Sequence, residues 1–285
     1  KSRETAFIAV PSPQAAVDLL SLAQDMSGNR VVGFELIADI ALQFSIRHAG
    51  VRHPLSDVSL WYVLAELSDP VPGAMMAILE RAMERGLVTD AALAQSDAQR
   101  ADFWTARELI SESQKPEGGS IKHDVSVPVS KVPQFLVEAD AAVSRLVPGA
   151  RFVSFGHLGD GNIHYNISQP VGMDKARFLD MWNEMNDVVF EVVGHFNGSI
   201  SAEHGIEAID LLGWNKPQMQ LRIRCGKGTY IRSLAHDLGA YWGCGAYLEG
   251  LRRTGIGSIT LDQAFQLEDF DAFLQIDSPT DHARR

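Results

Sequence analysis

The segment Gly156-His157-Leu158-Gly159-Asp160-Gly161-Asn162-Ile163-His164 constrains the fold of this chain more than any other stretch. Short apolar stretches flank it on both sides, at 151–155 and 165–168, and indicate two strands. Its Gly-Asp-Gly-Asn centre tolerates positive φ angles and predicts a hairpin turn. With the turn centred on Asp-Gly, His157 lies opposite His164 on one face of a sheet, with Cβ atoms about 4.5–5.5 Å apart. Two imidazoles in this arrangement can bind one divalent metal, Zn²⁺ being the leading candidate.

A second motif supplies a third ligand for such a metal. Glu203 and His204 follow the small-residue stretch 198–202, which indicates another strand. An isolated pair of histidines is more often two polar side chains on a solvated hairpin. With a carboxylate in a separate motif, a metal site formed by His157, His164 and Glu203 becomes the better interpretation.

These two motifs, GHLGDGNIHYNIS and GSISAEHGI, resemble the C-terminal substrate domain of FAD-linked 2-hydroxyacid dehydrogenases. That group includes D-lactate, glycolate and D-2-hydroxyglutarate dehydrogenases. The resemblance extends from about residue 1 to residue 205. It implies oxidation of a 2-hydroxy acid to a 2-oxo acid, with FAD held mainly by a separate N-terminal domain that these 285 residues do not include.

The resemblance also implies roles for individual residues. An Arg, a hydroxyl residue one helical turn later and a Lys in the next strand surround the substrate carboxylate in that group, and Arg107, Ser111 and Lys122 match them. Pattern alone would favour surface charge for Arg107 and Lys122. Asn166 lies nearby on the hairpin, and His204 takes the place of the general base. Ser111 stands where Thr is common in the dicarboxylate-specific members.

Alternating strand and helix signals predict an α+β fold, an antiparallel sheet with helices packed on one face. The strands are expected at 5–10, 31–37, 61–67 and 120–127, and the helices at 14–26, 74–86, 96–114, 132–147 and 174–197.

Composition sets further bounds. No run approaches the roughly 20 apolar residues of a membrane span, and no signal peptide opens the chain, which begins with Lys and is interpreted as a fragment. The two cysteines, Cys225 and Cys244, give no disulfide framework and favour a reducing cytoplasm.

The net charge of −11 divides into −10 for residues 1–205 and −1 for residues 206–285. Such an acidic first part argues against general nucleic-acid binding there.

The sequence after residue 205 follows a different pattern from the first part of the chain. The segment 220–239, QLRIRCGKGTYIRSLAHDLG, and the later Leu-Arg-Arg-Thr at 251–254 resemble bacterial TruB-type tRNA pseudouridine synthases over about residues 206–270. This resemblance implies a small α/β fragment in which Tyr230, Arg232 and Leu251 line a uridine pocket beside a basic, RNA-facing patch. The Leu-Asp-Pro motif that carries the nucleophilic Asp of that family is absent from the sequence, so no pseudouridine formation is expected.

The leading hypothesis joins a substrate- and metal-binding domain, residues 1–205, to a partial pseudouridine-synthase-like segment, residues 206–285. The alternative hypothesis is an RNA-binding protein whose function resides in the second segment. The third hypothesis is an inactive metal-binding remnant. The sequence is compatible with a natural fusion, a rearranged gene and an assembly artefact. Apolar faces that have lost their partners at the junction would favour a homo-oligomer.

Overall fold

The computed structural model describes residues 2–200, 206–225, 231–256 and 259–261. The chain divides into two compact units, residues 1–229 and 230–285.

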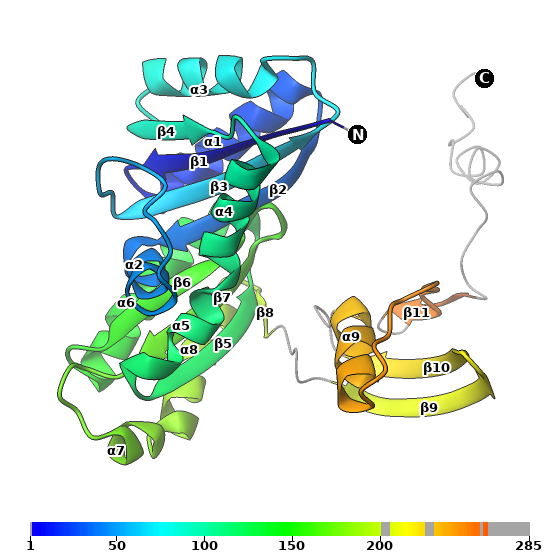
Figure 1. Ribbon diagram of the computed structural model, residues 1–285. Helices are drawn as coiled ribbons and strands as arrows, with labels where there is room; N and C mark the ends of the chain where they lie inside the picture. The colour runs from blue at the N-terminus through cyan, green and yellow to red at the C-terminus, as the bar shows by residue number, and fades with distance from the viewer. Residues whose placement is uncertain (1, 201–205, 226–230, 257–258, 262–285) are drawn as a thin grey trace, which may run out of the picture. The chain divides into compact units, whose positions relative to one another are not determined.

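The first unit is built on one antiparallel sheet of eight strands (Figure 1). The strands are β1 (Arg3–Val10), β2 (Val31–Ala38), β3 (Trp61–Ser68), β4 (Asp90–Leu93), β5 (Ser120–Ser126), β6 (Arg151–His157), β7 (Asn162–Ser168) and β8 (Ser199–Ile200). Their order across the sheet is β4-β1-β3-β2-β6-β7-β5-β8, and each neighbouring pair is antiparallel. The predicted antiparallel sheet is therefore confirmed.

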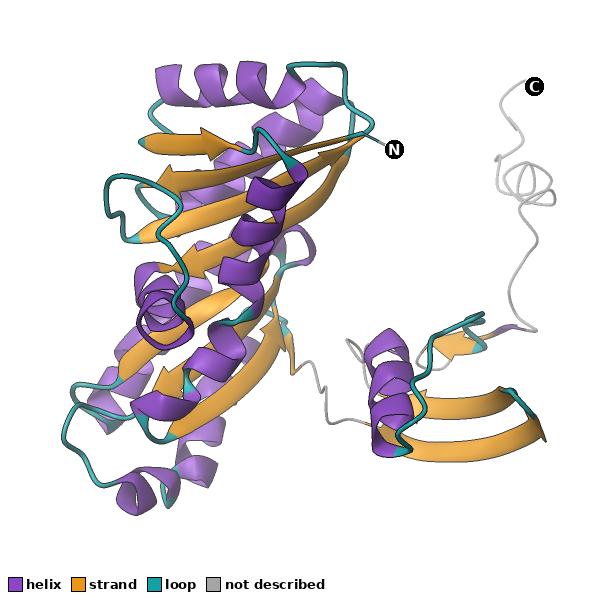
Figure 2. Ribbon diagram, viewed as in Figure 1, coloured by secondary structure: helices purple, strands orange, loops and turns teal. Residues whose placement is uncertain are grey.

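Helices pack against this sheet (Figure 2). The α-helices of the first unit are α1 (Pro13–Ser27), α2 (Asp39–Ala49), α3 (Ala74–Glu84), α4 (Asp97–Glu108), α5 (Ile110–Ser113), α6 (Val132–Leu146), α7 (Lys175–Leu179) and α8 (Trp182–His195). The short 3₁₀ turns are η1 (Lys115–Glu117), η2 (Val129–Lys131) and η3 (Leu158–Asp160). The segments expected as single helices at 96–114 and 174–197 are each divided in two, with breaks at Leu109 and at Asp180-Met181.

The helices cover both faces of the sheet rather than the one face that was expected. Helices α1, α3, α6 and α8 contribute to one buried apolar cluster, and α2, α4 and α5 contribute to the other. Along β1, Ile8 belongs to the first cluster and its neighbour Phe7 to the second, as successive side chains of a strand point to opposite faces. Strands that are apolar on both sides require cover on both sides, and this explains the difference.

The chain after residue 205 forms smaller elements. Strands β9 (Ile206–Asn215) and β10 (Gln218–Cys225) pair as an antiparallel hairpin. The second unit contains α9 (Ile231–Tyr241) and the short pair β11 (Gly255–Ile256) and β12 (Ile259–Thr260). Within the described residues, no helix has the length and apolar character needed to cross a membrane.

Candidate functional site

The two motif histidines lie on one face of the sheet, but they are not paired across the hairpin as expected. Phe155 is the residue opposite His164 in the β6–β7 ladder. The turn η3 occupies the segment after His157, so the loop is longer than a two-residue hairpin and the register shifts by two positions. A shift of two preserves the side-chain face, because side chains alternate with a period of two. The imidazole centroids are consequently 6.2 Å apart.

Glycines make this turn feasible. Gly161 has φ +69°, and a Cβ atom there would lie 2.0 Å from the carbonyl oxygen of Val127. Gly156 has φ +151°, and a Cβ atom there would lie 2.5 Å from the carbonyl oxygen of Asn162. A side chain at Gly156 or at Gly161 would therefore displace the backbone of the turn between them.

A buried carboxylate, Glu35, joins His157 to Arg107. Glu35 lies opposite His157 in the β2–β6 ladder, and a hydrogen bond links its Oε1 to Nδ1 of the imidazole. Arg107 Nε donates to the other oxygen, Oε2, at 2.9 Å. The Glu35 side chain is only 3% exposed. Sequence reasoning missed this residue, although a single charge inside the apolar run 31–38 was a usable signal.

The electrostatics of this pair favour an ionised Glu35. Burial alone would raise the pKa of Glu35, but the hydrogen bond with His157 and the charge of Arg107 outweigh it and lower the pKa. The same hydrogen bond raises the pKa of His157. His157 thus directs Nδ1–H at a carboxylate, and Nε2 lies on the other side of the ring.

His164 has the opposite character. Burial, reinforced by the positive charges of Arg107 and His157, lowers its pKa to about 4. Its Nδ1 lies 3.5 Å from Oδ1 of Asp124, the residue opposite it on β5. A neutral imidazole at pH 7 retains a nitrogen electron pair for a metal ion or a proton.

Helix α4 holds Arg107 against the sheet. Its guanidinium carbon lies 4.8 Å from the centroid of the Phe155 ring. One turn earlier on the same face, Trp104 Nε1 donates to Oε2 of the buried Glu66 at 3.2 Å. A Cβ atom at Gly33 would lie 3.2 Å from the Trp104 ring, so a small residue on β2 allows this close approach.

The other residues expected to bind a carboxylate lie on neighbouring elements. Lys122 on β5 is exposed and lies opposite Asn166 on β7, on the same face as His164. Asn166 is buried, and its Nδ2 donates to Oε1 of Gln114 at 3.1 Å. Ser111 lies exposed on α5, after the break at Leu109. It therefore does not share one continuous helix with Arg107 as expected.

The remaining expected site residues come from the segment after residue 200. Glu203, His204 and Tyr230 lie outside the described residues. Arg232 belongs to α9, and Leu251 is 67% exposed. Within the described ranges, no group of three or more His, Cys, Asp or Glu side chains could hold a metal ion.

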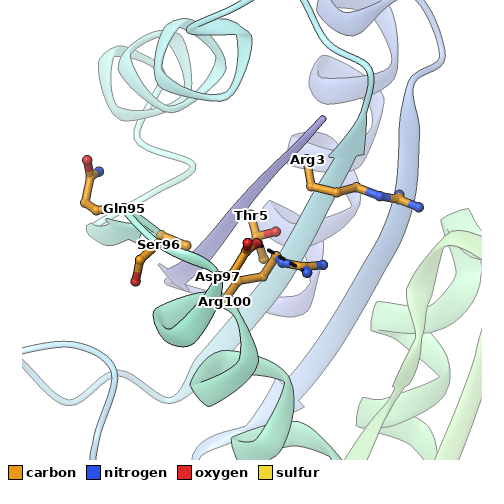
Figure 3. Close-up of a pocket in the computed structure, with 7 residues that line it drawn as sticks. Arg3, Thr5, Gln95, Ser96, Asp97 and Arg100 are labelled. Carbon is orange, nitrogen blue, oxygen red and sulfur yellow. Dashed lines mark ion pairs between the residues drawn. The ribbon is translucent and has the colours of Figure 1, made fainter. Parts of the chain in front are cut away.

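A hollow of about 220 Å³ lies beside the N-terminus of α4, where Arg3, Thr5 and Arg100 line it (Figure 3). Both arginines already pair with the buried Glu66, at 3.3 and 3.6 Å. Asp97 lies 3.5 Å from Arg100 as well. The positive charges of this hollow are therefore balanced internally, and it is not a candidate for an anionic substrate.

Comparison with known proteins agrees with both resemblances. Residues 1–207 match the family described as FAD linked oxidases, C-terminal domain, and residues 232–283 match the family described as tRNA pseudouridylate synthase B C-terminal domain. Both resemblances drawn from the sequence are thereby confirmed.

Relatives of the first part include three proteins named D-2-hydroxyglutarate dehydrogenase. The one from Xanthomonas citri pv. viticola is 37% identical, across 62% of this chain and 38% of the relative. The one from Stutzerimonas stutzeri is 39% identical over the same shares, and the mitochondrial one from Arabidopsis thaliana is 34% identical across 70% of this chain and 35% of the relative. The chain thus spans well under half the length of these relatives. Because the match over residues 1–207 covers most of its 285 residues, the chain belongs to the family of FAD linked oxidases, C-terminal domain.

Proposed function

We propose that residues 1–207 form the substrate- and metal-binding part of an FAD-dependent D-2-hydroxyacid dehydrogenase, which oxidises a 2-hydroxy acid to a 2-oxo acid. One observation carries the proposal: two imidazoles share a sheet face, and each has Nδ1 near a carboxylate. Arg107, Lys122 and Asn166 belong to elements on the same face. The names of the relatives support a hydroxyacid as the substrate.

The imidazoles fit a divalent metal, for which we propose Zn²⁺. Histidine ligands in metalloproteins commonly direct their second nitrogen at a carboxylate, which fixes the tautomer and the ring orientation. Glu35 and Asp124 lie in that position for His157 and His164. Nε2 of each imidazole would hold the ion, with Glu203 as a third ligand. The fourth position would take the hydroxyl or carboxylate oxygen of the substrate.

The substrate carboxylate would be bound by charged and amide groups next to the imidazoles. Glu35 holds Nε of Arg107, so the terminal nitrogens of the guanidinium are the donors for a carboxylate. Lys122 adds a mobile point charge from β5, and Asn166 adds an amide. Ser111 would join them from α5.

The chemistry divides between this chain and a flavin domain. FAD, when bound, supplies the hydride acceptor. His204 would accept the hydroxyl proton while the C–H bond at Cα breaks, so the substrate loses one proton and one hydride. The charge of a nearby metal ion would help the hydroxyl group to ionise.

Metal content of the purified chain tests the site directly. The wild type is expected to carry about one Zn²⁺ per chain, and a His157→Ala/His164→Ala variant is expected to carry none. His195→Ala, which removes an exposed imidazole from the end of α8, is the control and should keep the metal. A well-folded wild type without zinc after dialysis against the ion would contradict the proposed site.

The base assignment needs a separate experiment. In a flavoprotein reconstituted with an FAD-binding domain, His204→Ala should keep its zinc and lose turnover by about 10²–10⁴-fold. Unchanged turnover would refute the role of His204.

A second candidate function applies to the C-terminal part. Arg222 and Arg224 lie exposed on the polar face of β10, and the segment after them matches a tRNA-modifying family. We propose RNA binding for this part, with Tyr230, Arg232 and Leu251 at its pocket. Binding of tRNA that weakens steeply with added salt, and that is lost in Arg222→Gln/Arg224→Gln, would support it. Salt-independent or absent binding would contradict it.

We propose a cytoplasmic location on the basis of the two cysteines alone. Both Cys225 and Cys244 are free thiols, which suits a reducing cytoplasm. Several relatives carry the word mitochondrial in their names. Fractionation of cells that produce the chain would decide between the two compartments.

A further inference from the structure

A pocket of about 310 Å³ lies next to the proposed carboxylate-binding residues. Three lysines line it: Lys115 after α5, Lys122 on β5 and Lys175 at the start of α7. Leu179 and Trp182 form an apolar wall from α7 and α8. The name lysine pocket is used for this set of five residues.

The lysine pocket carries a positive charge in an acidic chain. Residues 1–205 have a net charge of −10, so the meeting of three lysines from three elements is not a result of composition. Lys115 pairs with the exposed Glu112 at 2.5 Å. Within the described part of the chain, no ion pair is found for Lys122 or Lys175. The hydrogen bond with Lys115 lowers the pKa of Glu112, and the charge of Lys122 contributes to this shift only at longer range. An anion entering the pocket would therefore meet the ammonium groups of Lys122 and Lys175 without breaking a direct ion pair.

The wall that carries Lys115 is held firmly. Glu117, two residues later, accepts hydrogen bonds from Arg151 and Arg47, and His48 also contacts it at 2.7 Å. Gly119 N donates to the Gln169 side chain. These four side chains fix the backbone of the loop that follows Lys115.

The floor of the pocket connects it to the candidate site. Gln114 lines the pocket, is almost fully buried, and accepts the hydrogen bond from Asn166 Nδ2. Trp182 is 43% exposed, so its indole is available to a ligand. A charged rim, an amide floor and an apolar wall together suit a small organic anion rather than a bare ion.

We propose that the lysine pocket is a subsite for a small organic anion that bears a carboxylate or phosphate group. The charged group would contact Lys122 and Lys175, and the carbon skeleton would lie on Trp182 and Leu179. This proposal rests on the proposed function only through Lys122, which both sites share; Lys175 and Trp182 are additional to it. The ligand would bind without using either imidazole.

Titration of the full chain with glutarate and, separately, with inorganic phosphate tests the proposal through tryptophan fluorescence. At least one of the two anions should give a saturable change that disappears in Trp182→Phe. Lys175→Gln should weaken binding about fivefold, the upper end for an exposed ion pair. Lys131→Gln removes an exposed lysine from η2 and should leave the affinity unchanged. Added salt should weaken binding to the wild type.

The outcomes separate the ligand classes and the two proposals. A response to glutarate alone assigns a carboxylate, and a response to phosphate alone assigns a phosphate. Binding that survives in His157→Ala/His164→Ala supports the lysine pocket even if the zinc site fails. The proposal is overturned if neither anion gives a saturable signal, if the signal persists in Trp182→Phe, or if Lys175→Gln and Lys131→Gln behave alike.

Discussion

Glu35 connects the two halves of the candidate site through its two carboxylate oxygens. One oxygen contacts the imidazole of His157, and the other accepts from Arg107. A buried carboxylate shared in this way fixes His157, the proposed metal ligand, and Arg107, the proposed carboxylate-binding residue, relative to each other. Under the proposed function, this spacing would decide whether one substrate can reach both the metal ion and the guanidinium at once.

We expect Glu35→Gln to lower zinc affinity by about 10–100-fold, the usual effect of losing the carboxylate behind a histidine ligand. Glu66→Gln is the matched control. Glu66 is also a buried acid beneath α4, but it pairs with Arg3, Arg100 and Trp104 and contacts neither imidazole. Both variants should lose some stability, and only Glu35→Gln should lose metal affinity in a competition titration. Equal zinc affinities in the two variants would show that Glu35 is merely structural.

Asp140 provides a prediction about pH. Burial raises its pKa to about 6, although the hydroxyl of Tyr165 donates to its Oδ1 at 2.8 Å. Between about pH 4 and pH 6 the Asp140 carboxyl therefore keeps its proton in the folded chain, whereas in the unfolded chain it has released it. The free energy of unfolding consequently falls as the pH rises through this range. The full loss is at most about 3 kcal/mol by pH 7.

Asp140→Asn keeps the acceptor oxygen and removes the charge. The variant should be as stable as the wild type near pH 4 and more stable at pH 7, when urea unfolding is compared at both values. A stability difference that does not change with pH would contradict the raised pKa of Asp140.

At the scale of single residues, the structure brings five of the expected side chains to one sheet face, while the sequence did not predict the residues that connect them. His157, His164, Arg107, Lys122 and Asn166 all come from strands or helices that border one sheet face. Glu35 and Gln114 were missed because their partners are distant in the chain: Glu35 meets a residue on β6, and Gln114 meets one on β7. The apolar run around Glu35 indicates that this side chain is buried, but nothing local identifies the distant residue that it contacts.

At the scale of elements, the hairpin β6–β7 depends on the glycines in its turn. Gly161 has a positive φ, and a Cβ atom there would overlap the Val127 carbonyl oxygen. We expect Gly161→Ala to lower the free energy of unfolding by about 2 kcal/mol or more, the combined cost of backbone strain and displacement. Zinc affinity should fall as well, because the turn sets the spacing of the two imidazoles.

Gly159→Ala is the control within the same turn, since a Cβ atom at Gly159 would meet nothing within 4 Å. It should leave both stability and zinc affinity close to wild type. Urea unfolding and a zinc competition titration measure both quantities. If the two alanine variants behave alike, the close approach at Gly161 does not determine the turn.

The elements themselves were largely predictable, and their exact pairing was not. The helix expected at 14–26 is observed as α1 at Pro13–Ser27, where Ser12 caps its start by accepting from Ala15 N and Gly28 ends it with φ +64°. The β6–β7 register depended on η3, a 3₁₀ turn that turn-type rules for short hairpins do not anticipate. The packing of helices on both faces of the sheet was not predicted, because it depends on which face each helix packs against, and helices on one face are far apart in the chain.

At the scale of the whole molecule, the described residues combine an eight-stranded sheet with a two-stranded hairpin that exposes apolar side chains. All eight strands of the sheet and both apolar clusters come from residues before 201. Strand β9 instead exposes Leu211 to 57% and Trp214 to 56%. Apolar side chains exposed in a row on a two-stranded hairpin favour association between chains.

We therefore expect a chain that ends at Glu207 to fold, to melt at the temperature of the full chain's main transition, and to bind zinc and organic anions equally well. A chain that ends at Cys225 keeps the hairpin and serves as the control. Light scattering at matched concentrations should show more self-association for the control than for the shorter chain, since only the control retains Leu211 and Trp214. Equal association of the two would exclude the hairpin as its cause. Failure of the shorter chain to fold would instead show that β9 and β10 stabilise the sheet, and the proposed boundary near residue 205 would have to move to the end of β10.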